Sequence, residues 1–498
     1  MIAPYTNTVP SRCLYQLERR NHSRCSLSQT SRGRCSRVVT LNEVKGLSER
    51  FFAEFILSVV EGLRMTWSGG PIIKCTNVTQ SGLVFLSLLL FVTLLHLDSY
   101  NGSASAEESH THYRIVNGAI PEPLTHTAGD SLRGRQIVED RERGDCIVCH
   151  VIPLSNHQMH GTVGPPLDGV GGRYPAGVLR LRLADSKMIN PQSVMPAYYK
   201  TTGLFRVSKS RRDQTLLPAQ EIEDVIAYLL TLTYSSLASG GQNTQHVAIA
   251  QPDGGPHKGD QSPYSVDARR SGYTYLSPDN QQLQNDEFAN PGMLWVERGR
   301  ELWGTTDGTV HAACTNCHAD GESMRGVRTR YPRFDPQRNK LINLEQQINR
   351  CREQQMKATA YAYESEALLA LTTFISFQSR NQPMNVQIDG PVLPFFRAGR
   401  AFFRQRRGQL DLACTHCHDL HNGQRLRGEV ISQGHTNGFP IYRQLWQTLG
   451  SSHRMFAWCN TAIRAEPFAL GSDEYVNLEL YMAWRARGLP IESPAIRR

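Results

Sequence analysis

Three short stretches decide how this chain folds: CIVCH at residues 146–150, CTNCH at 314–318 and CTHCH at 414–418. In each, two cysteines are followed directly by a histidine, the pattern of covalent c-type haem attachment. A zinc site would need four ligands in a tetrahedron, and a dithiol redox motif does not require the histidine. We therefore predict three haem c groups, bonded to the six cysteines and held by the three histidines: Cys146, Cys149, His150, Cys314, Cys317, His318, Cys414, Cys417 and His418.

The second and third motifs lie in an internal repeat. VERGRELW places Gly299 fifteen residues before Cys314, and FRAGRAFF places Gly399 fifteen residues before Cys414. Each half then carries a late amphipathic segment with helical spacing of its apolar residues. A repeat of about a hundred residues is typical of one small cytochrome c domain that has been duplicated.

The first motif belongs to a similar but separate unit. It ends in QEIEDVIAYLLTLT (220–233), whose apolar residues share one helix face. A stretch rich in Gly, Ser, Gln and Pro follows and predicts a linker. The predicted fold class is mainly α, with three cytochrome c-like haem domains; the predicted ranges are 107–236 for the first domain, 237–265 for the linker, 266–388 for the second domain and 389–498 for the third.

The N-terminal region predicts export. Residues 82–98 contain one apolar run, shorter than the roughly 20 residues that a membrane span needs, and small residues around Ala106 fit a cleavage site. We read 65–106 as a signal peptide cleaved near Ala106 and 1–64 as a misassigned upstream extension. We therefore predict a periplasmic protein with no stable membrane anchor. The alternative is that the segment stays uncleaved as an anchor.

The net charge gives no support for a nucleic-acid partner. Of the formal +9, residues 1–106 carry +5, from eleven Lys/Arg and six Asp/Glu. The remaining part of the chain is near +4, which is too mild, and no basic run of the phosphate-binding kind occurs.

The ligand opposite each proximal histidine largely defines a cytochrome, because it sets the redox potential. In the first domain NPQSVMPAYY places Met195 before a proline, the usual distal arrangement in small cytochromes c, with Met159 and Met188 as competitors. GPPLDG places the Pro165 carbonyl where it can accept from the ring N–H of His150.

Each repeat half instead contains a lone cysteine after its haem motif. Cys351 comes 33 residues after His318, and Cys459 comes 41 residues after His418. Three interpretations stand: an inert buried thiol, a Cys351–Cys459 disulfide, and thiolate ligation of iron. The matching positions favour ligation; the thioether alternatives are Met356, Met384, Met455 and Met482.

In this combination of motifs the chain resembles the SoxAX cytochrome family, with its two subunits fused and the SoxX-like part first. CIVCH, GPPLDGVGGRY and NPQSVMPAYY resemble SoxX, the monohaem domain. The duplicated dihaem module resembles SoxA in NPGMLWVERGRELW, CTNCHADG, LEQQINRCR, CTHCHD, CNTAIRAEPF and SDEYVNLELYMAWRARG. Fusion would make the interface between the subunits intramolecular.

The resemblance implies an L-cysteine S-thiosulfotransferase. Such an enzyme joins thiosulfate oxidatively to a cysteine of a SoxYZ-type carrier protein and passes two electrons through haem to a small acceptor cytochrome c. It implies that Cys459 ligates the third iron, is modified to a persulfide and is the active-site thiol. Cys351 is then the ligand of the second iron.

Thiosulfate is a dianion, so its site needs cations. Arg454 and Arg464 flank Cys459 and are the local candidates, although each could equally form a surface salt bridge. The family usually has an arginine four residues before the active cysteine, where this chain has Met455.

Two other functions compete with the conjugating enzyme: a multihaem electron carrier without bond-forming activity, and a dihaem peroxidase. A carrier has no need of a thiol at its last iron, and a peroxidase needs an open or displaceable site. The lone cysteines therefore favour the enzyme.

Overall fold

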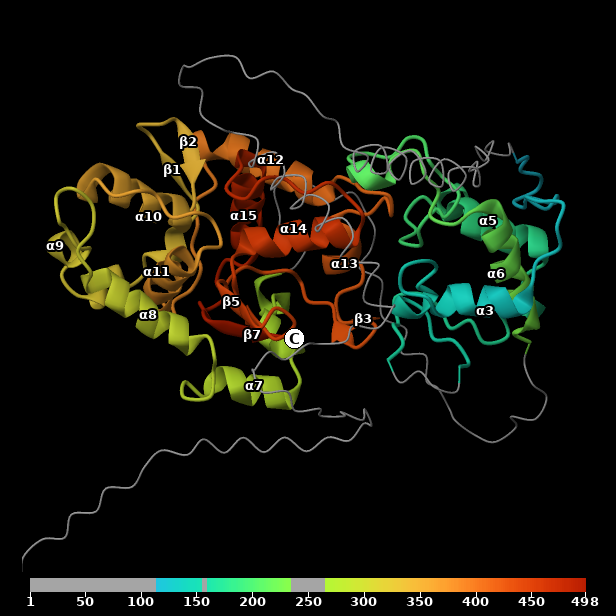
Figure 1. The fold of residues 1–498 in the computed structure, drawn as a ribbon, viewed down its shortest axis with the longest axis horizontal. Helices are drawn as coiled ribbons and strands as arrows, with labels where there is room; N and C mark the ends of the chain where they lie inside the picture. Colours follow the sequence, from blue (N-terminus) through green and yellow to red (C-terminus); the bar gives the residue numbers. More distant parts are fainter. Residues whose placement is uncertain (1–112, 155–158, 234–264) are drawn as a thin grey trace, which may run out of the picture. The chain divides into compact units, whose positions relative to one another are not determined.

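The structure, a computed structural model, describes residues 113–154, 159–233 and 265–498 (Figure 1). The predicted extension (1–64), the signal peptide (65–106) and all but the last residue of the linker (237–265) lie outside the described residues. All of the described residues belong to one unit, Glu107–Arg498. Among the residues described, no helix has the length and apolar character to cross a membrane.

The first domain is built from helices, which confirms the mainly helical prediction for this part of the chain. Asp130 caps the first of these by accepting from the backbone N–H of Leu132 over 2.8 Å. Its helices are α3 (Ser131–Glu139), α4 (Val170–Arg173), α5 (Ala176–Asp185) and α6 (Ala219–Thr231), with shorter turns at η2 (Cys146–Val148), η3 (Ser186–Met188) and η4 (Lys209–Arg211).

The second and third domains repeat one order of elements: a helix, a haem motif, a two-stranded hairpin, the helix with the lone cysteine, and a final helix. In the second domain these are α8 (Met293–Gly304), α9 (Thr315–His318), β1 (Arg333–Asp335), β2 (Lys340–Ile342), α10 (Leu344–Cys351) and α11 (Glu366–Phe377). In the third they are α12 (Leu393–Arg404), α13 (Cys414–His418), β5 (Ile441–Arg443), β6 (Thr448–Gly450), α14 (Ser452–Ala462) and α15 (Asp473–Arg485).

The remaining elements surround this repeat. A second hairpin pairs β3 (Arg425–Leu426) with β4 (Glu429–Val430), and β7 (Ala495–Arg497) joins β5 in parallel, which gives a sheet of order β6-β5-β7. The other helical segments are η5 (Val266–Ala268), η6 (Gly272–Tyr275), α7 (Pro278–Asn285), η7 (Gly321–Met324), η8 (Arg328–Arg330), the π-helix η9 (Arg352–Met356) and η10 (Gly390–Val392).

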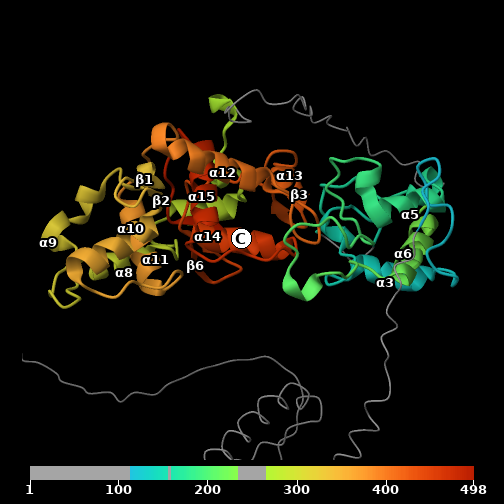
Figure 2. The same ribbon diagram turned by 90° about the horizontal axis from the view of Figure 1, so that it is seen from above.

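One glycine in each domain lets two helices cross at close range. Gly134 of α3 lies against the Asp224 carbonyl of α6, Gly299 of α8 against Ala370 of α11, and Gly399 of α12 against Asn477 of α15. A Cβ at any of the three would overlap that carbonyl. Figure 2 shows α3 beside α6 and α12 beside α15. The repeat glycines of the sequence are therefore helix-crossing positions, each a short distance before a haem motif.

Each domain also has its own buried core at this crossing. Ile137, Ile222 and Val225 form part of the first core. Aromatic residues dominate the third, where the rings of Phe396 and Trp484 meet edge to face with centroids 4.9 Å apart. These cores hold the helices that present the haem motifs.

Candidate functional site

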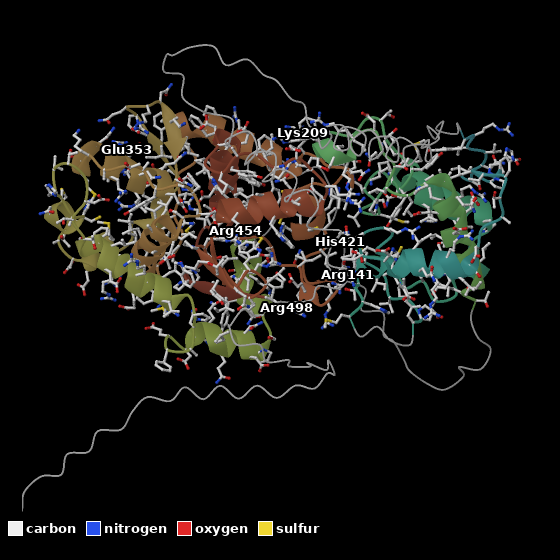
Figure 3. All side chains as sticks on the ribbon, viewed as in Figure 1. Arg141, Lys209, Glu353, His421, Arg454 and Arg498 are labelled. Carbon is white, nitrogen blue, oxygen red and sulfur yellow. The ribbon has the colours of Figure 1, made fainter. Side chains whose placement is uncertain are left out.

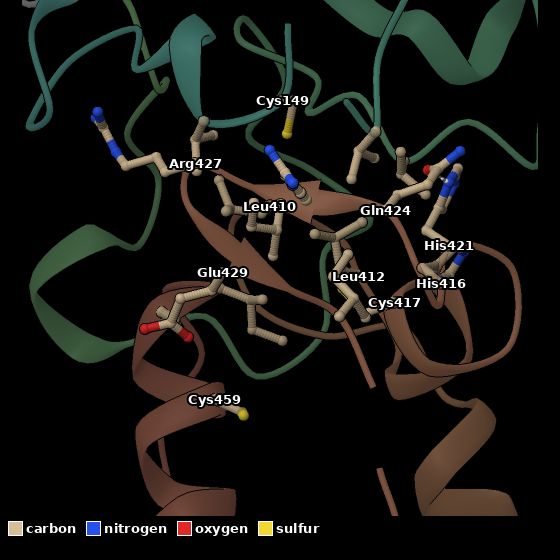
Figure 4. Close-up of a pocket in the computed structure, with 18 of the residues that line it drawn as sticks. Cys149, Leu410, Leu412, His416, Cys417, His421, Gln424, Arg427, Glu429 and Cys459 are labelled. Atoms are coloured by element: carbon tan, nitrogen blue, oxygen red, sulfur yellow. Dashed lines mark hydrogen bonds between the residues drawn. The ribbon is translucent and has the colours of Figure 1, made fainter. Parts of the chain in front are cut away.

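The first and third haem motifs line one cavity of about 2650 Å³. Its wall includes both motifs together with one methionine and one lone cysteine: Cys146, Cys149, His150, Cys414, Cys417, His418, Met195 and Cys459. Figure 4 shows Cys149 at one side of this space and Cys417 and Cys459 at the other. The structure thus brings together two motifs that are far apart in the sequence, and the second motif is not in this wall.

Both proximal histidines of the cavity are oriented by a backbone carbonyl. The Nδ1 atom of His150 lies 2.7 Å from the Pro165 oxygen, which confirms the contact predicted from GPPLDG. The Nδ1 atom of His418 lies 2.7 Å from the Ser432 oxygen. With the proton on Nδ1, the lone pair of the imidazole is on Nε2, the nitrogen that can bind an iron.

A glycine lies against each of these imidazole rings. A Cβ on Gly164 would overlap the His150 ring, and one on Gly434 would come within 2.9 Å of His418 Cγ. These positions leave room for a ring packed flat beside the backbone. With the paired thiols of each motif one turn away, the residues of the first and third motifs fit a covalent haem.

The second motif has a different setting, because Cys317 and His318 are exposed. The Trp303 ring packs beside the imidazole, with centroids 5.7 Å apart. Burial, and then the neighbouring Cys351, raise the pKa of the Cys314 thiol to about 11. Cys351 therefore lies close to the second motif, where a ligand of its iron would have to lie.

The two lone cysteines occupy equivalent positions on equivalent helices. Asn343 caps α10 and Ser451 caps α14, each by accepting from a backbone N–H in the first turn. Cys351 and Cys459 each come eight residues after the cap. Both are free cysteines, so the structure does not contain the disulfide alternative.

Met195 is the methionine best placed to face the first motif. It lies in the cavity wall, as Met159 also does, and the Ser186 hydroxyl and the Lys187 ammonium donate to its backbone carbonyl over 2.6 and 2.9 Å. The competitors Met159 and Met188 are 52% and 61% exposed. The fixed loop favours Met195 as the distal ligand.

The thioether alternatives in the third domain are also placed by the structure. A Cβ on Gly434 would lie 3.1 Å from the Met482 methyl group and 2.9 Å from the His418 ring, so Met482 is on the proximal side. Met455 contacts Arg443, whose Nη1 lies 3.8 Å from its sulfur. Met455 and Cys459 are the sulfurs of α14 that line the cavity, and Cys459 stays the predicted ligand of the third haem.

The environment of Cys459 does not by itself make a thiolate. Burial raises its pKa to about 12, with Cys414 and Cys417 adding to the increase and Arg443 opposing it. A thiol that coordinates a metal is deprotonated by the metal. The chain therefore supplies a shielded thiol, and its reactive form depends on the haem.

Comparison with known proteins places this geometry in a family. A model of the SoxA/TsdA cytochrome c domain matches residues 298–384, and a cytochrome c model matches 131–233. The chain is 40% identical over 232 residues to the L-cysteine S-thiosulfotransferase subunit SoxA of Rhodovulum sulfidophilum, covering 46% of this chain and 81% of that protein. The chain belongs to the SoxA family.

Two further proteins, one sequence and one solved structure, are similar to this chain over about half of its length. The SoxA subunit of Pseudaminobacter salicylatoxidans is 37% identical over 251 residues, which covers 50% of this chain and 85% of the relative. The crystal structure of SoxXA from P. pantotrophus matches at 35% identity and a TM-score of 0.45, covering 46% of this chain and 87% of that chain.

Arg454, one of the two cations that the sequence analysis named as substrate candidates, is not among the residues that line the cavity. Its guanidinium packs over the Trp446 ring at 4.4 Å and donates to the Leu449 carbonyl over 3.2 Å. Figure 3 labels the position of Arg454 in the third domain. Five residues along a helix turn a side chain by about 140°, so Arg454 and Cys459 point in different directions.

Arg464 does line the cavity, at its border with the first domain. It donates to Gln409 Oε1 over 3.2 Å and to the Glu142 carbonyl over 3.1 Å. Both partners are neutral oxygens, so its charge is not cancelled by a carboxylate in direct contact.

Sequence reasoning missed Arg443. This side chain is 3% exposed and lies in the cavity wall, and its positive charge lowers the pKa of the Cys459 thiol against the effect of burial. Its sequence position, sixteen residues before Cys459, carries no local signal. The one sequence signal for Arg443 is its place at the end of a short apolar strand. The pairing of β5 with β6 and β7, which the sequence does not show, brings this arginine to α14.

Proposed function

We propose that the chain joins thiosulfate to a cysteine of a SoxYZ-type carrier protein. The carrier thiol RSH and S₂O₃²⁻ give RS–S–SO₃⁻ and one proton, and two electrons leave through c-type haem to a small acceptor cytochrome c. The observation that carries this proposal is that Cys459 shares one cavity with the first and third haem motifs. A thiol that shares a cavity with two haem motifs can handle sulfur next to an electron acceptor.

The proposal includes three haem c groups with distinct axial pairs. These are His150 with Met195, His318 with Cys351, and His418 with Cys459. The haem, when bound, supplies the electron acceptor and the metal that holds the sulfur as thiolate. The chain's own part is to orient the His150 and His418 imidazoles through Nδ1 and to present each sulfur from a capped helix or a tied loop.

The active thiol in this proposal is Cys459, carried as a persulfide, and the substrate is the thiosulfate dianion. Cys459 is half-buried in the wall of the cavity, where cations of the wall can attract the dianion. Arg464 attracts the anion at the border of the cavity.

The residues of the third and first motifs would hold the two haems that pass the electrons on. Their motifs share a cavity, whereas the second motif is outside its wall. The first domain acts as the SoxX-like partner within the same chain, in the periplasm, and hands electrons to the acceptor cytochrome. Within the fused chain, tethering replaces the affinity between two subunits.

The decisive experiment compares Cys459→Ser with Cys351→Ser in purified holoprotein. Thiosulfate, a SoxYZ-type carrier and an oxidised cytochrome c are supplied, and both carrier conjugation and cytochrome reduction are followed. We expect Cys459→Ser to abolish both and Cys351→Ser, which alters the other thiol, to retain them. Full-rate conjugation by Cys459→Ser at unchanged haem content would refute the proposal and leave the electron-carrier alternative.

A further inference from the structure

Arg443 is a buried cation held rigidly in the wall of the Cys459 cavity. It is the last residue of β5, the middle strand of the β6-β5-β7 sheet. Its backbone is in register with Thr448 on one side and Arg497 on the other. The side chain is 3% exposed, so its charge has lost nearly all contact with water.

The contacts of the Arg443 guanidinium aim it at the face of α14 that carries the thiol. It lies 4.0 Å from the centroid of the Trp458 ring, and Nη1 lies 3.8 Å from the Met455 sulfur. Met455 precedes Cys459 by four residues, so the two side chains share one helix face. Nε donates to the backbone oxygen of Arg498 over 2.8 Å, which fixes the plane of the guanidinium.

The carboxylate partner of Arg443 is loosely held. Both oxygens of Glu429 lie 3.4 Å from Nη2, whereas a tight guanidinium–carboxylate pair is about 2.7–2.9 Å long. The Glu429 side chain is 46% exposed and projects from the short β3–β4 hairpin. Figure 4 shows this carboxylate on the side of the cavity nearest Cys459.

The two residues thus differ in how easily they can move. A buried guanidinium needs an anion, because an uncompensated buried charge is costly. The exposed Glu429 can turn to solvent at little cost, but the paired strand and two aromatic rings hold Arg443 in place. The pair therefore presents a fixed cation with an exchangeable counter-ion.

We infer that Arg443 binds the sulfonate end of thiosulfate beside Cys459 and that Glu429 is the counter-ion which the dianion displaces. This inference rests on the proposed function. The planar fork of a guanidinium matches two oxygens of a sulfonate. The rigid cation orients the substrate, and the carboxylate keeps the site neutral while it is empty of substrate and lowers affinity for weaker anions.

Two other arginines of the cavity wall, Arg427 and Arg464, bind partners elsewhere in the structure. Arg427 pairs directly with Asp145 of the first domain, and Arg464 bonds to neutral oxygens at the domain border. Neither contacts the α14 face that carries Met455 and Cys459 in the hydrogen bonds of the described residues. Arg443 is the cation that does.

The test measures thiosulfate binding and turnover in holoprotein variants. Arg443→Met should raise the KM for thiosulfate about tenfold or more, and Arg443→Lys should raise it less, because the charge remains and the fork is lost. Glu429→Gln should lower KM about two- to fivefold, because the competing carboxylate is gone. Arg300→Met, a change at an exposed arginine of α8, is the matched control and should leave KM unchanged.

Two further readouts separate this inference from other roles. Thiosulfate titration of the haem absorption spectrum gives a Kd that does not require turnover, and redox titration gives the potential of the third haem. An unchanged Kd in Arg443→Lys together with a shifted potential would assign Arg443 to the haem and overturn the inference. An unchanged or raised Kd in the folded surface variant Glu429→Gln would also overturn it. Absent conjugation in the unmodified protein, with Kd shifts as expected, would refute only the proposed function.

Discussion

The backbone N–H of Arg427 donates to the carbonyl of Val148 over 3.0 Å, which ties the β3–β4 hairpin to the loop of the first haem motif. The backbone of Arg425 in the same hairpin makes two hydrogen bonds with Thr162: its N–H donates to the Thr162 hydroxyl over 3.0 Å, and its carbonyl accepts from the Thr162 N–H over 2.9 Å. An ion pair joins the Arg427 side chain to Asp145. The hairpin that carries Glu429 therefore also couples two haem sites.

Removal of the Arg427 side chain should slow electron transfer between the third and first haems. Arg427→Ala deletes the ion pair with Asp145, loosening the contact, whereas Arg425→Ala keeps backbone bonds that do not depend on the side chain. Stopped-flow reduction of the first haem by thiosulfate should be several-fold slower in Arg427→Ala. Equal rates in the two variants would show that the ion pair does not hold the haems together.

Cys351 should contribute one of two thiolate–haem signals. Low-spin electron paramagnetic resonance signals of this type depend on thiolate ligation. We expect two in the unmodified protein and one in Cys351→Ser. Because the second motif lies outside the cavity wall, conjugation in this variant should stay within about twofold of normal. Persistence of both signals would remove Cys351 from the ligand assignment.

Arg454 should prove unimportant for the substrate. Its guanidinium lies on Trp446 and 3.8 Å from a Glu364 oxygen, away from the cavity. Arg454→Ala is expected to leave the KM for thiosulfate unchanged and to cost at most about 1 kcal/mol of stability. Steady-state kinetics and thermal unfolding measure the two effects. A large KM increase would restore the original assignment of this arginine.

Glu345 should make stability depend on pH. Burial, and then Glu479, raise the pKa of its carboxyl from an ordinary value of 4.5 to about 7, opposed by His453 and Arg328. The folded chain then binds a proton more tightly than the unfolded chain. Stability from this group is complete below about pH 4.5 and is lost as the pH rises through about 7.

The Glu345→Gln variant removes that titration. Its unfolding temperature should exceed that of the unmodified protein at pH 8 and fall less between pH 5 and pH 8. The control is Glu353→Gln, at an exposed position of the following π-helix, which should leave the pH profile unchanged. Parallel profiles for Glu345→Gln and the unmodified protein would show that the buried carboxyl does not titrate in this range.

The sequence by itself determined those features that depend on residues close together along the chain. The spacing of Cys146, Cys149 and His150 predicts haem attachment because one turn places all three together. The crossing glycines and the equivalent positions of Cys351 and Cys459 also follow from local order, because a duplicated unit repeats its caps and helices.

Only the tertiary structure decided which groups meet across long stretches of chain. Asp145 and Arg427 are 282 residues apart, yet they pair at the shared cavity. Arg443 reaches the face of α14 through strand pairing, while the nearer Arg454 turns away. Periodicity fixes the direction of a side chain on its own helix, but the contact between two segments depends on how their buried faces pack.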